Sequence, residues 1–392
     1  MTKRKLGIAV IGVGGAVGTT MFAGIELLRK GVVGTQGLPL ADLAGVELTP
    51  YEQIEIAGWD LYETNLARAA EEHDVLTLKQ FSAVEAELKE ARPWPGIGNP
   101  NFVTNISGQN LISASGHRAA VERIKQDIEK FRQRCESVVV INLASTEKLS
   151  SEGNEIFNSV AGLERALDED SKDISPAILY AYAAISSGVP YGNFTPSAAA
   201  DIPALIELAE SEQVPIAGKD GKTGQTFIKS VLAPAFRSRA LKVEGWFSTN
   251  ILGNRDGLVL SDEDSLASKV KTKSSLLDDI LGYRVEDHIV DIRYYRPRKD
   301  NKEAWDNIDL TGFLGQPMQL KVNFLCRDSI LAAPLAIEIA RCLDLARQRG
   351  EKGVQEQLSV FFKLPMTRRE HPEQAFHRQE EMLLKYLLSG AD

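Results

Sequence analysis

Residues 8–20 read Ile8-Ala9-Val10-Ile11-Gly12-Val13-Gly14-Gly15-Ala16-Val17-Gly18-Thr19-Thr20, an unbroken apolar run that passes into closely spaced glycines. The run that ends here, Leu6 to Ile11, lacks polar alternation, which is typical of a parallel strand buried on both faces. Beyond the glycines, apolar residues at helical spacing predict a helix over residues 17–30. The stretch therefore predicts a strand, a glycine turn and a helix.

The glycines of this turn follow a variant of the dinucleotide-binding fingerprint, shifted by one residue at its third glycine. Such glycines let the backbone approach a pyrophosphate, whose charge meets the unpaired N–H groups and the dipole of the next helix. The alternative is a close-packed turn without a ligand, but the position between a strand and a helix favours dinucleotide binding. The expected cofactor contacts are Gly12, Val13, Gly14, Gly15, Ala16 and Val17.

A second strand is predicted from Ile54 to Asp60, the residue that closes it. In a dinucleotide-binding fold, a carboxylate at this point binds the hydroxyls of the adenosine ribose, which makes Asp60 a candidate cofactor contact. The spacing Asp60-x-x-Glu63 also fits a capping box for a following helix. Both interpretations stay open, because Asp60 lies about twice as far beyond the glycine turn as in the common fingerprint.

Another buried parallel strand is predicted over residues 138–141, and it passes into a segment of small polar residues, 142–147. Ligands of open α/β sheets lie beyond the carboxyl ends of the strands. Ala144 and Ser145 are therefore further candidate contacts for the cofactor.

Length, charge and composition limit the classes of protein to consider. A chain of 392 residues suggests two domains or one domain with a large insertion. The net charge of −9 argues against a nucleic-acid partner, and the absence of a long apolar stretch or signal peptide predicts a cytoplasmic protein without a membrane span. Three widely spaced cysteines, Cys135, Cys326 and Cys342, argue against disulfides and thiolate metal sites. The five histidines lack ligand spacing, and surface positions are expected for all of them: His73, His117, His288, His371 and His377.

A second informative stretch is Gly218-Lys219-Asp220-Gly221-Lys222-Thr223-Gly224-Gln225-Thr226. Only two residues separate its first two glycines, where a Walker A loop has four residues before Gly-Lys-Thr, so ATP binding is disfavoured. A glycine-rich turn with cations and hydroxyls before a helix is a good anion site for a substrate phosphate. A flexible polar loop explains the same segment equally well.

Three later segments alternate apolar and polar residues with a period of two: residues 243–250, 288–295 and 318–324. The alternation predicts an antiparallel sheet with one covered face. Residues 265–281 have helical spacing and carry Lys269 and Lys273 on one helix face. These lysines form either a solvated basic face or a site for an anion.

The patterns together predict an α/β protein, with a Rossmann-type doubly wound parallel sheet and an inserted α+β domain. We expect residues 1–200 and 330–392 to form the NAD-binding domain and residues 201–329 an inserted α+β substrate and oligomerisation domain. Helical spacing and breaker residues predict these further helices: residues 83–91, 117–132, 176–187, 202–210, 227–236, 330–346, 353–365 and 373–388.

Six motifs carry a family resemblance that covers nearly the whole chain in order. They are Gly12 to Thr20, Gly58-Trp59-Asp60, Asn193-Phe194-Thr195-Pro196-Ser197, Asp220 to Thr226, Asn250-Ile251-Leu252-Gly253-Asn254-Arg255-Asp256-Gly257, and Asp328-Ser329-Ile330-Leu331-Ala332-Ala333-Pro334-Leu335. The chain resembles myo-inositol-phosphate synthase in its short bacterial and archaeal form, and the middle motifs are specific to that family.

The resemblance implies an NAD-dependent, redox-neutral conversion of D-glucose 6-phosphate to 1D-myo-inositol 3-phosphate, an isomerase reaction of inositol and phospholipid biosynthesis. In the family's reaction the C5 hydroxyl is oxidised, and the adjacent carbon is enolised and attacks C1 in an intramolecular aldol step. The C5 ketone is then reduced again. The resemblance also implies a homotetramer and a mono- or divalent cation, for which no ligand cluster stands out in the sequence.

Four lysines match the family's catalytic lysines: Lys269, Lys273, Lys302 and Lys363. By the family's pattern, Lys269 moves the C5 hydroxyl proton, and Lys363 protonates or stabilises the oxygen at C1. The other two lysines hold the phosphate and the enolate. Several ammonium groups in one pocket lower one another's pKa values, so that one can act as a base. The implied substrate contacts are Thr223, Gly224, Gln225, Thr226 and Asn250. Asp220 and Asp328 are implied to lie near the nicotinamide and to orient the lysines.

One departure from the family is Ala16-Val17, where many members have a pair of asparagines, so two cofactor hydrogen bonds are expected to be missing. Two other functions stay open. One is an NAD(P)-dependent dehydrogenase that releases its reduced cofactor, and the other is a non-catalytic NAD-binding regulator. The four matched lysines in a chain of net negative charge argue against the regulator.

Overall fold

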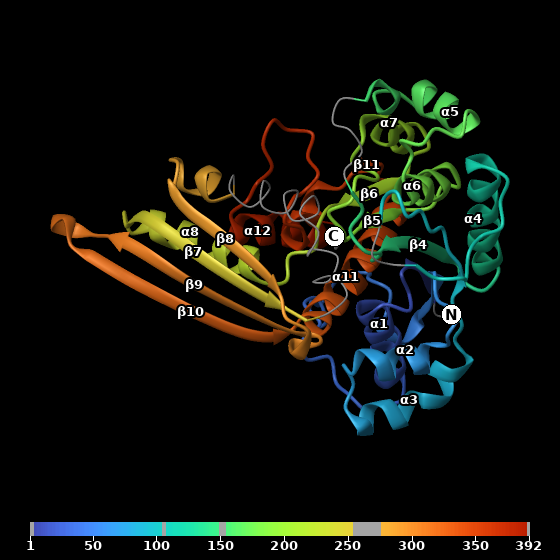
Figure 1. Cartoon of the computed structure of the whole chain (residues 1–392), viewed down its shortest axis with the longest axis horizontal. Helices are drawn as coiled ribbons and strands as arrows, with labels where there is room; N and C mark the ends of the chain where they lie inside the picture. The colour runs from blue at the N-terminus through green and yellow to red at the C-terminus, as the bar shows by residue number, and fades with distance from the viewer. Residues whose placement is uncertain (1–3, 104–106, 149–153, 254–275, 390–392) are drawn as a thin grey trace.

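The computed structural model describes residues 4–103, 107–148, 154–253 and 276–389. These described residues form two sheets, a seven-stranded sheet flanked by helices and a four-stranded sheet that extends away from it (Figure 1). The helix α11 (Asp328–Gln348) follows the last strand of the second sheet and runs back into the body of the first (Figure 1). The expected α/β architecture with a second, inserted sheet is therefore confirmed.

The seven-stranded sheet has the order β11-β6-β5-β4-β1-β2-β3, and its described strand pairs are parallel. Its strands are β1 (Leu6–Ile11), β2 (Ile54–Asp60), β3 (Trp94–Pro95), β4 (Ser137–Asn142), β5 (Tyr191–Asn193), β6 (Pro215–Gly218) and β11 (Gly353–Val354). Every residue of β1 is buried, because β2 and β4 pair with it on both sides and helices cover both faces. The sheet also includes β6, which lies beyond residue 200, the limit expected for the first domain.

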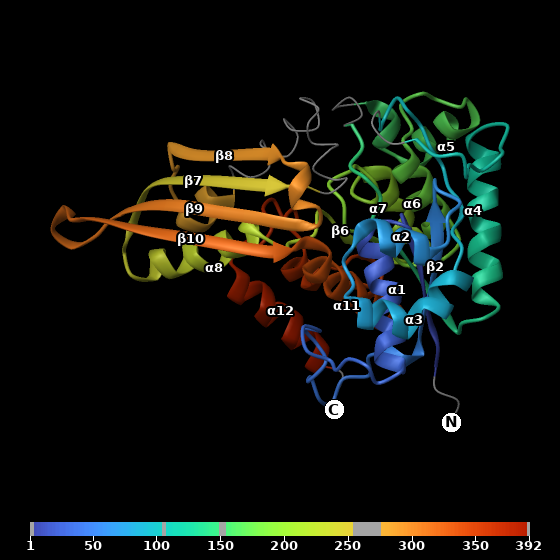
Figure 2. The same cartoon turned by 60° about the horizontal axis from the view of Figure 1, so that its bottom comes forward.

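Helices cover both faces of this sheet, and each face has its own apolar core (Figure 2). One layer contains α4 (His117–Arg132), α5 (Val160–Asp168), α6 (Pro176–Ser186) and α7 (Pro203–Ser211). The other layer contains α1 (Ala16–Arg29), α2 (Leu66–His73), α3 (Leu78–Glu90), α11 and α12 (Phe376–Leu388). Since α1 and α11 pack against each other, the two ends of the chain share one core.

The four-stranded sheet has the order β10-β9-β7-β8. Its strands are β7 (Lys242–Leu252), β8 (Asp287–Tyr294), β9 (Asn301–Thr311) and β10 (Pro317–Arg327). The pairs β7–β9 and β9–β10 are antiparallel, as predicted, but β8 runs parallel to β7, so the prediction of a purely antiparallel sheet is wrong. The helix α8 (Gln225–Ser238) covers one face, where Trp246 and Ile308 are fully buried.

Two further local predictions are wrong. Residues 353–365 form β11, a 3-10 turn and an extended segment instead of a helix, because their backbone groups bond to residues 214–222. The helix after β2 begins at Leu66 and is capped by Asn65, whose side chain accepts a hydrogen bond from the Arg68 N–H at 3.0 Å. Asp60 therefore does not cap that helix and instead ends β2.

Candidate active site

A cavity of about 490 Å³ lies beyond the carboxyl ends of β1, β4 and β5. Between β1 and β4 the order of the strands reverses, and such a switch point is where open α/β sheets bind their ligands. The cavity is also lined by β7, by the start of β9 and by the first residues of α11. Both sheets therefore contribute side chains to one site.

The glycine turn forms one wall of this cavity. Gly12 has a φ of +86°, a conformation that favours glycine, and its N–H donates to the Trp59 carbonyl oxygen at 2.8 Å. A Cβ at Gly18 would lie 2.5 Å from the Val13 carbonyl oxygen, so glycine lets α1 pack closely on β1. In the described helix α1, the first turn has neither a side-chain cap nor an acidic residue. Its backbone N–H groups therefore fit a pyrophosphate.

Asp60 lies at the edge of the same wall. Its Oδ2 accepts a hydrogen bond from the Gly14 N–H at 2.9 Å, and its Oδ1 accepts one from the Tyr62 N–H at 3.2 Å. Each carboxylate oxygen can accept more than one hydrogen bond, and Asp60 lines the cavity. The carboxylate is thus placed where it can both hold the turn and accept ribose hydroxyls.

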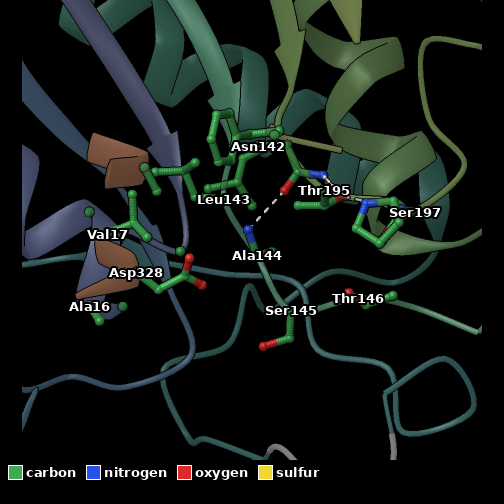
Figure 3. A pocket seen from close by; sticks show the side chains of 18 of the residues that line it. Ala16, Val17, Asn142, Leu143, Ala144, Ser145, Thr146, Thr195, Ser197 and Asp328 are labelled. Carbon is green, nitrogen blue, oxygen red and sulfur yellow. Dashed lines mark hydrogen bonds between the residues drawn. The ribbon is translucent and has the colours of Figure 1, made fainter. Parts of the chain in front are cut away.

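The loop after β4, whose Ala144 backbone lies against Gly12, is held by a buried amide network that the sequence did not predict. The Asn142 Oδ1 accepts from the Ala144 N–H at 3.1 Å, and its Nδ2 donates to Thr195 Oγ1 at 3.4 Å (Figure 3). Asn193, at the end of β5, donates to the Ser197 carbonyl oxygen at 2.8 Å. One sequence signal could have revealed this network, an asparagine at the end of each of two neighbouring strands, β4 and β5. Together these bonds orient the loop that carries Ala144 and Ser145.

Two lysine–aspartate pairs lie in the cavity. Lys363 Nζ is 2.8 Å from Asp220 Oδ1, and Lys302 Nζ is 3.3 Å from Asp328 Oδ1. All four side chains are largely buried, and they come from four separate segments of the chain. Figure 3 shows the Asp328 carboxylate between the first turn of α1 and the loop after β4. Both pairs therefore line the same cavity as the glycine turn.

The other predicted substrate contacts surround these pairs. Thr223 Oγ1 donates to Asp328 Oδ1 at 3.1 Å. Gln225 donates to the Thr249 carbonyl oxygen at 3.0 Å and accepts from Asn250 Nδ2. The following predicted residues line the cavity: Gly12, Gly15, Ala16, Val17, Asp60, Ala144, Ser145, Asp220, Thr223, Gly224, Gln225, Thr226, Asn250, Lys302, Asp328 and Lys363. Val13 and Gly14 belong to the turn but not to this lining, and Lys269 and Lys273 lie outside the described residues.

Two buried carboxyl groups at the cavity were not predicted. Burial raises the pKa of Asp300 to about 6, and its Oδ1 accepts from Ser329 Oγ at 2.6 Å. Burial also raises the pKa of Glu147 to about 7, and its Oε1 accepts a hydrogen bond from the Ala177 N–H, in the first turn of α6, at 2.9 Å. Both residues line the cavity. Neither belongs to a recognisable motif, so only the folded chain reveals them.

The prediction that all five histidines lie on the surface is wrong for three of them. His73, His117 and His288 are half-buried and contact a backbone carbonyl oxygen or a lysine. Only His371 and His377 are exposed among these residues. The absence of metal-ligand spacing therefore did not indicate whether a histidine is exposed.

Among the described residues, no group of three or more His, Cys, Asp or Glu side chains is arranged to hold a metal ion, and the three cysteines are free thiols. Within the same part of the chain, no helix is both long and apolar enough to cross a membrane.

The fold and the glycine turn define the class of this chain, the dinucleotide-binding α/β proteins. Its cavity is also lined by the two lysine–aspartate pairs. A family model described as myo-inositol-1-phosphate synthase, one of the NAD-binding families, matches residues 35–387. The chain belongs to this myo-inositol-1-phosphate synthase family, and the resemblance noted in the sequence is confirmed.

Individual relatives agree with this assignment. The chain is 43% identical to inositol-3-phosphate synthase 1 of Bacteroides thetaiotaomicron, over 98% of this chain and 95% of that protein. It is 30% identical to inositol-3-phosphate synthase 1 of Oryza sativa subsp. japonica, over 88% and 75% of the two chains. The fold matches the crystal structure of inositol-3-phosphate synthase from Caenorhabditis elegans with a TM-score of 0.91 and 27% identity, over 100% and 86% of the two chains.

Proposed function

We propose that the protein converts D-glucose 6-phosphate to 1D-myo-inositol 3-phosphate with bound NAD and no net redox change. The observation that carries this proposal is the presence of two lysine–aspartate pairs in the cavity that the glycine turn lines. A simple dehydrogenase needs one proton carrier, whereas cyclisation also needs groups for the C1 oxygen and the enolate. The names of the relatives, which are inositol-3-phosphate synthases, support the same reaction.

The residues that would hold NAD follow from the two walls of the cavity. The N–H groups at the start of α1, around Ala16 and Val17, receive the pyrophosphate, and Asp60 receives the adenosine ribose. Ala144 and Ser145 face the cofactor from the loop after β4. When bound, NAD would supply a reversible hydride acceptor for C5.

The lysines divide the proton transfers between them. Lys269 takes the C5 hydroxyl proton, and Lys363, oriented by Asp220, donates to the oxygen at C1. Lys302, oriented by Asp328, holds the phosphate and the enolate together with Lys273. Thr223, Gly224, Gln225, Thr226 and Asn250 add hydrogen bonds to the substrate.

A cation would fit beside Asp300. Its Oδ2 is buried and, among the described residues, has no hydrogen-bond partner, while Ser329 Oγ lies on the neighbouring oxygen at 2.6 Å. Oxygen ligands of this kind suit a mono- or divalent hard cation. We expect activity to depend on added K⁺ or Mg²⁺ in the wild type and to lose that dependence in Asp300→Asn, as cation titrations would measure.

We also propose a homotetramer, with self-association through the second sheet. The face of this sheet opposite α8 exposes large apolar side chains: Phe247, Ile289, Trp305 and Leu325. Exposed apolar area of this kind commonly marks an interface. Sedimentation should give a tetramer for the wild type and smaller species for the double variant Trp305→Glu, Leu325→Glu.

The expected location is the cytoplasm, whose reducing conditions suit three free thiols.

Incubation with glucose 6-phosphate and a catalytic amount of NAD tests the proposal. Inositol phosphate is followed by NMR, and free NADH is followed by its absorbance. The expected result is many turnovers of cyclitol for each NAD without accumulation of NADH. Stoichiometric NADH with an open-chain or lactone product, and no cyclitol, would contradict the proposed cyclisation and support the dehydrogenase alternative.

A further inference from the structure

His73 contacts the glycine turn from an element that no cofactor motif includes. It is the last residue of α2 and lines the cavity, and its Nε2 is 2.9 Å from the Gly14 carbonyl oxygen. A carbonyl oxygen only accepts hydrogen bonds, so Nε2 carries the proton in this contact. His73 is therefore a donor to the turn.

Asp60 holds the same glycine from the other side. The Gly14 N–H donates to Asp60 Oδ2 at 2.9 Å, and the Gly14 carbonyl oxygen accepts a hydrogen bond from His73. The two peptide groups that flank Gly14 are thus each fixed by a side chain from a different element. Gly15 N–H is in turn directed back to the Gly12 carbonyl oxygen at 3.0 Å, which closes the turn.

Glycine has the greatest backbone freedom of any residue, so a turn with this many glycines needs external contacts to keep one conformation. A turn that is ordered before binding does not lose that freedom when the ligand arrives. In this chain the turn ends in Ala16 and Val17, which offer no polar side chain to the cofactor. Binding therefore depends on the orientation of the backbone N–H groups.

We propose that His73 is a positioning residue of the cofactor site, which holds the peptide between Gly14 and Gly15 and preforms the turn that receives the dinucleotide pyrophosphate. The inference rests on the proposed binding of NAD and adds a residue to it. His73 acts through the turn, since its contact is with the backbone of Gly14 and not with a side chain of the fingerprint.

The position of His73 is itself fixed by the second sheet. Asp74, the next residue, ends α2 with a φ of 53° and pairs with Lys299 Nζ at 2.8 Å. Arg327, at the end of β10, donates to the carbonyl oxygens of Asp74 and Val75. The end of α2 therefore connects the lysine-bearing sheet to the dinucleotide turn.

The chain offers a matched control in His117. Its Nε2 lies 2.8 Å from the Ser171 carbonyl oxygen, and the ring is half-buried, as in His73. Among the residues found to line the cavity, His117 is absent. Equal substitutions at the two positions remove the same type of hydrogen bond, once at the turn and once far from it.

The test compares His73→Gln, His73→Asn and His73→Leu with the same changes at His117. The Gln amide nitrogen reaches the position of the histidine Nε2, whereas the Asn amide is one methylene shorter. NAD affinity is measured by calorimetry, and unfolding temperature is measured alongside. We expect His73→Asn and His73→Leu to weaken NAD binding by about 5- to 30-fold. His73→Gln should recover most of the affinity, and kcat at saturating NAD should fall by a smaller factor than the affinity.

The His117 variants should keep the wild-type NAD affinity even where they lower the unfolding temperature equally. Wild-type affinity in His73→Asn and His73→Leu, or an equal loss in His73→Gln and His73→Leu, would overturn the inference about His73 alone. If His73→Leu does not fold, the Gln and Asn variants decide. A wild-type protein that fails to bind NAD would instead overturn the proposed function, and this inference with it.

Discussion

On the dinucleotide side of the cavity, the proposed cofactor contacts belong mainly to the backbone of one short turn, residues 12–17. On the lysine side they are charged side chains from four separate segments, held in two ion pairs. The first arrangement is built by adjacent residues and the second only by the folded chain. Cofactor binding should therefore tolerate side-chain changes on the lysine side that abolish turnover.

The largest expected effect separates these two sides at Lys363. Replacing Lys363 with Ala should lower kcat by about 10² to 10⁴, since it removes a proton carrier, while calorimetry should still detect NAD binding. Lys219→Ala is the matched control, because Lys219 pairs with Asp201 at 2.6 Å and is about as buried as Lys363. Loss of NAD binding in the Lys363 variant, or an equal loss of turnover in the control, would contradict the division.

Lys302 should show a smaller effect of a different kind. Removing its charge-assisted contact with the phosphate should cost on the order of 1.5 to 3 kcal/mol, seen as a raised KM for glucose 6-phosphate with a lowered kcat. Lys242→Ala removes an exposed pair with Glu244 from the same sheet and should change neither constant more than about twofold. An unchanged KM in the steady-state kinetics of Lys302→Ala would contradict the assignment of the substrate phosphate to Lys302.

Asp60 tests the dinucleotide side. Its carboxylate should repel the 2′-phosphate of NADP, so titrations should find NAD bound more tightly than NADP in the wild type. Asp60→Ala should reduce that preference by about 10- to 100-fold and should also weaken NAD, because the Gly14 N–H loses its acceptor. Equal or tighter binding of NADP by the wild type would be inconsistent with the ribose assignment.

A last effect concerns stability and not turnover, at the buried Lys222 of the segment that carries Asp220 and Thr223. Lys222 is buried and donates to Gln379, and among the described residues it has no carboxylate partner. Burial lowers its pKa from 10.5 to about 7. Between these two pH values the unfolded chain binds about one more proton than the folded chain. The free energy of unfolding should therefore rise with pH, by up to about 1.4 kcal/mol per pH unit from this group.

Urea unfolding of the wild type and Lys222→Met between pH 7 and 10 measures this contribution. Below about pH 7 both states of the wild type are protonated, so the full cost of burying the charge is present there. The difference between the two proteins should shrink as the pH rises, since deprotonation removes the same cost that Met removes. A pH-independent difference would show that Lys222 keeps its proton throughout.

The same contrast explains what the sequence could predict. The strand β1, its glycine turn and α1 follow from residues next to one another, because periodicity and glycine spacing are local signals. The strand β9 was missed since its inward positions include Asp306, which breaks the apolar alternation. That carboxylate is buried because it accepts from Trp246 Nε1 at 2.8 Å and from Ser248 Oγ at 2.6 Å. Polar partners on β7, distant in sequence, make the strand possible.

The cavity shows the same limit. Asp220 and Lys363 were named through the family resemblance, but nothing local to either residue places them 2.8 Å apart. Residues 353–365 follow a helical pattern, yet the Lys363 N–H donates to the Asp220 carbonyl oxygen at 2.6 Å, so tertiary pairing replaces the helix. His73 gave no signal at all, because its function depends on a contact with a backbone oxygen. Contacts between distant segments therefore decide what sequence patterns leave open.

The central claim is that oxidation, ring closure and reduction occur on one substrate molecule in one cavity. A mixture of unlabelled glucose 6-phosphate and glucose 6-phosphate carrying deuterium at C5 and ¹³C elsewhere tests it directly, with excess unlabelled NADH in solution. Mass spectrometry of the inositol phosphate should find deuterium only in molecules that also carry ¹³C, because the hydride returns to the carbon that gave it. Deuterium in unlabelled product, or its loss to the free NADH pool, would contradict the account.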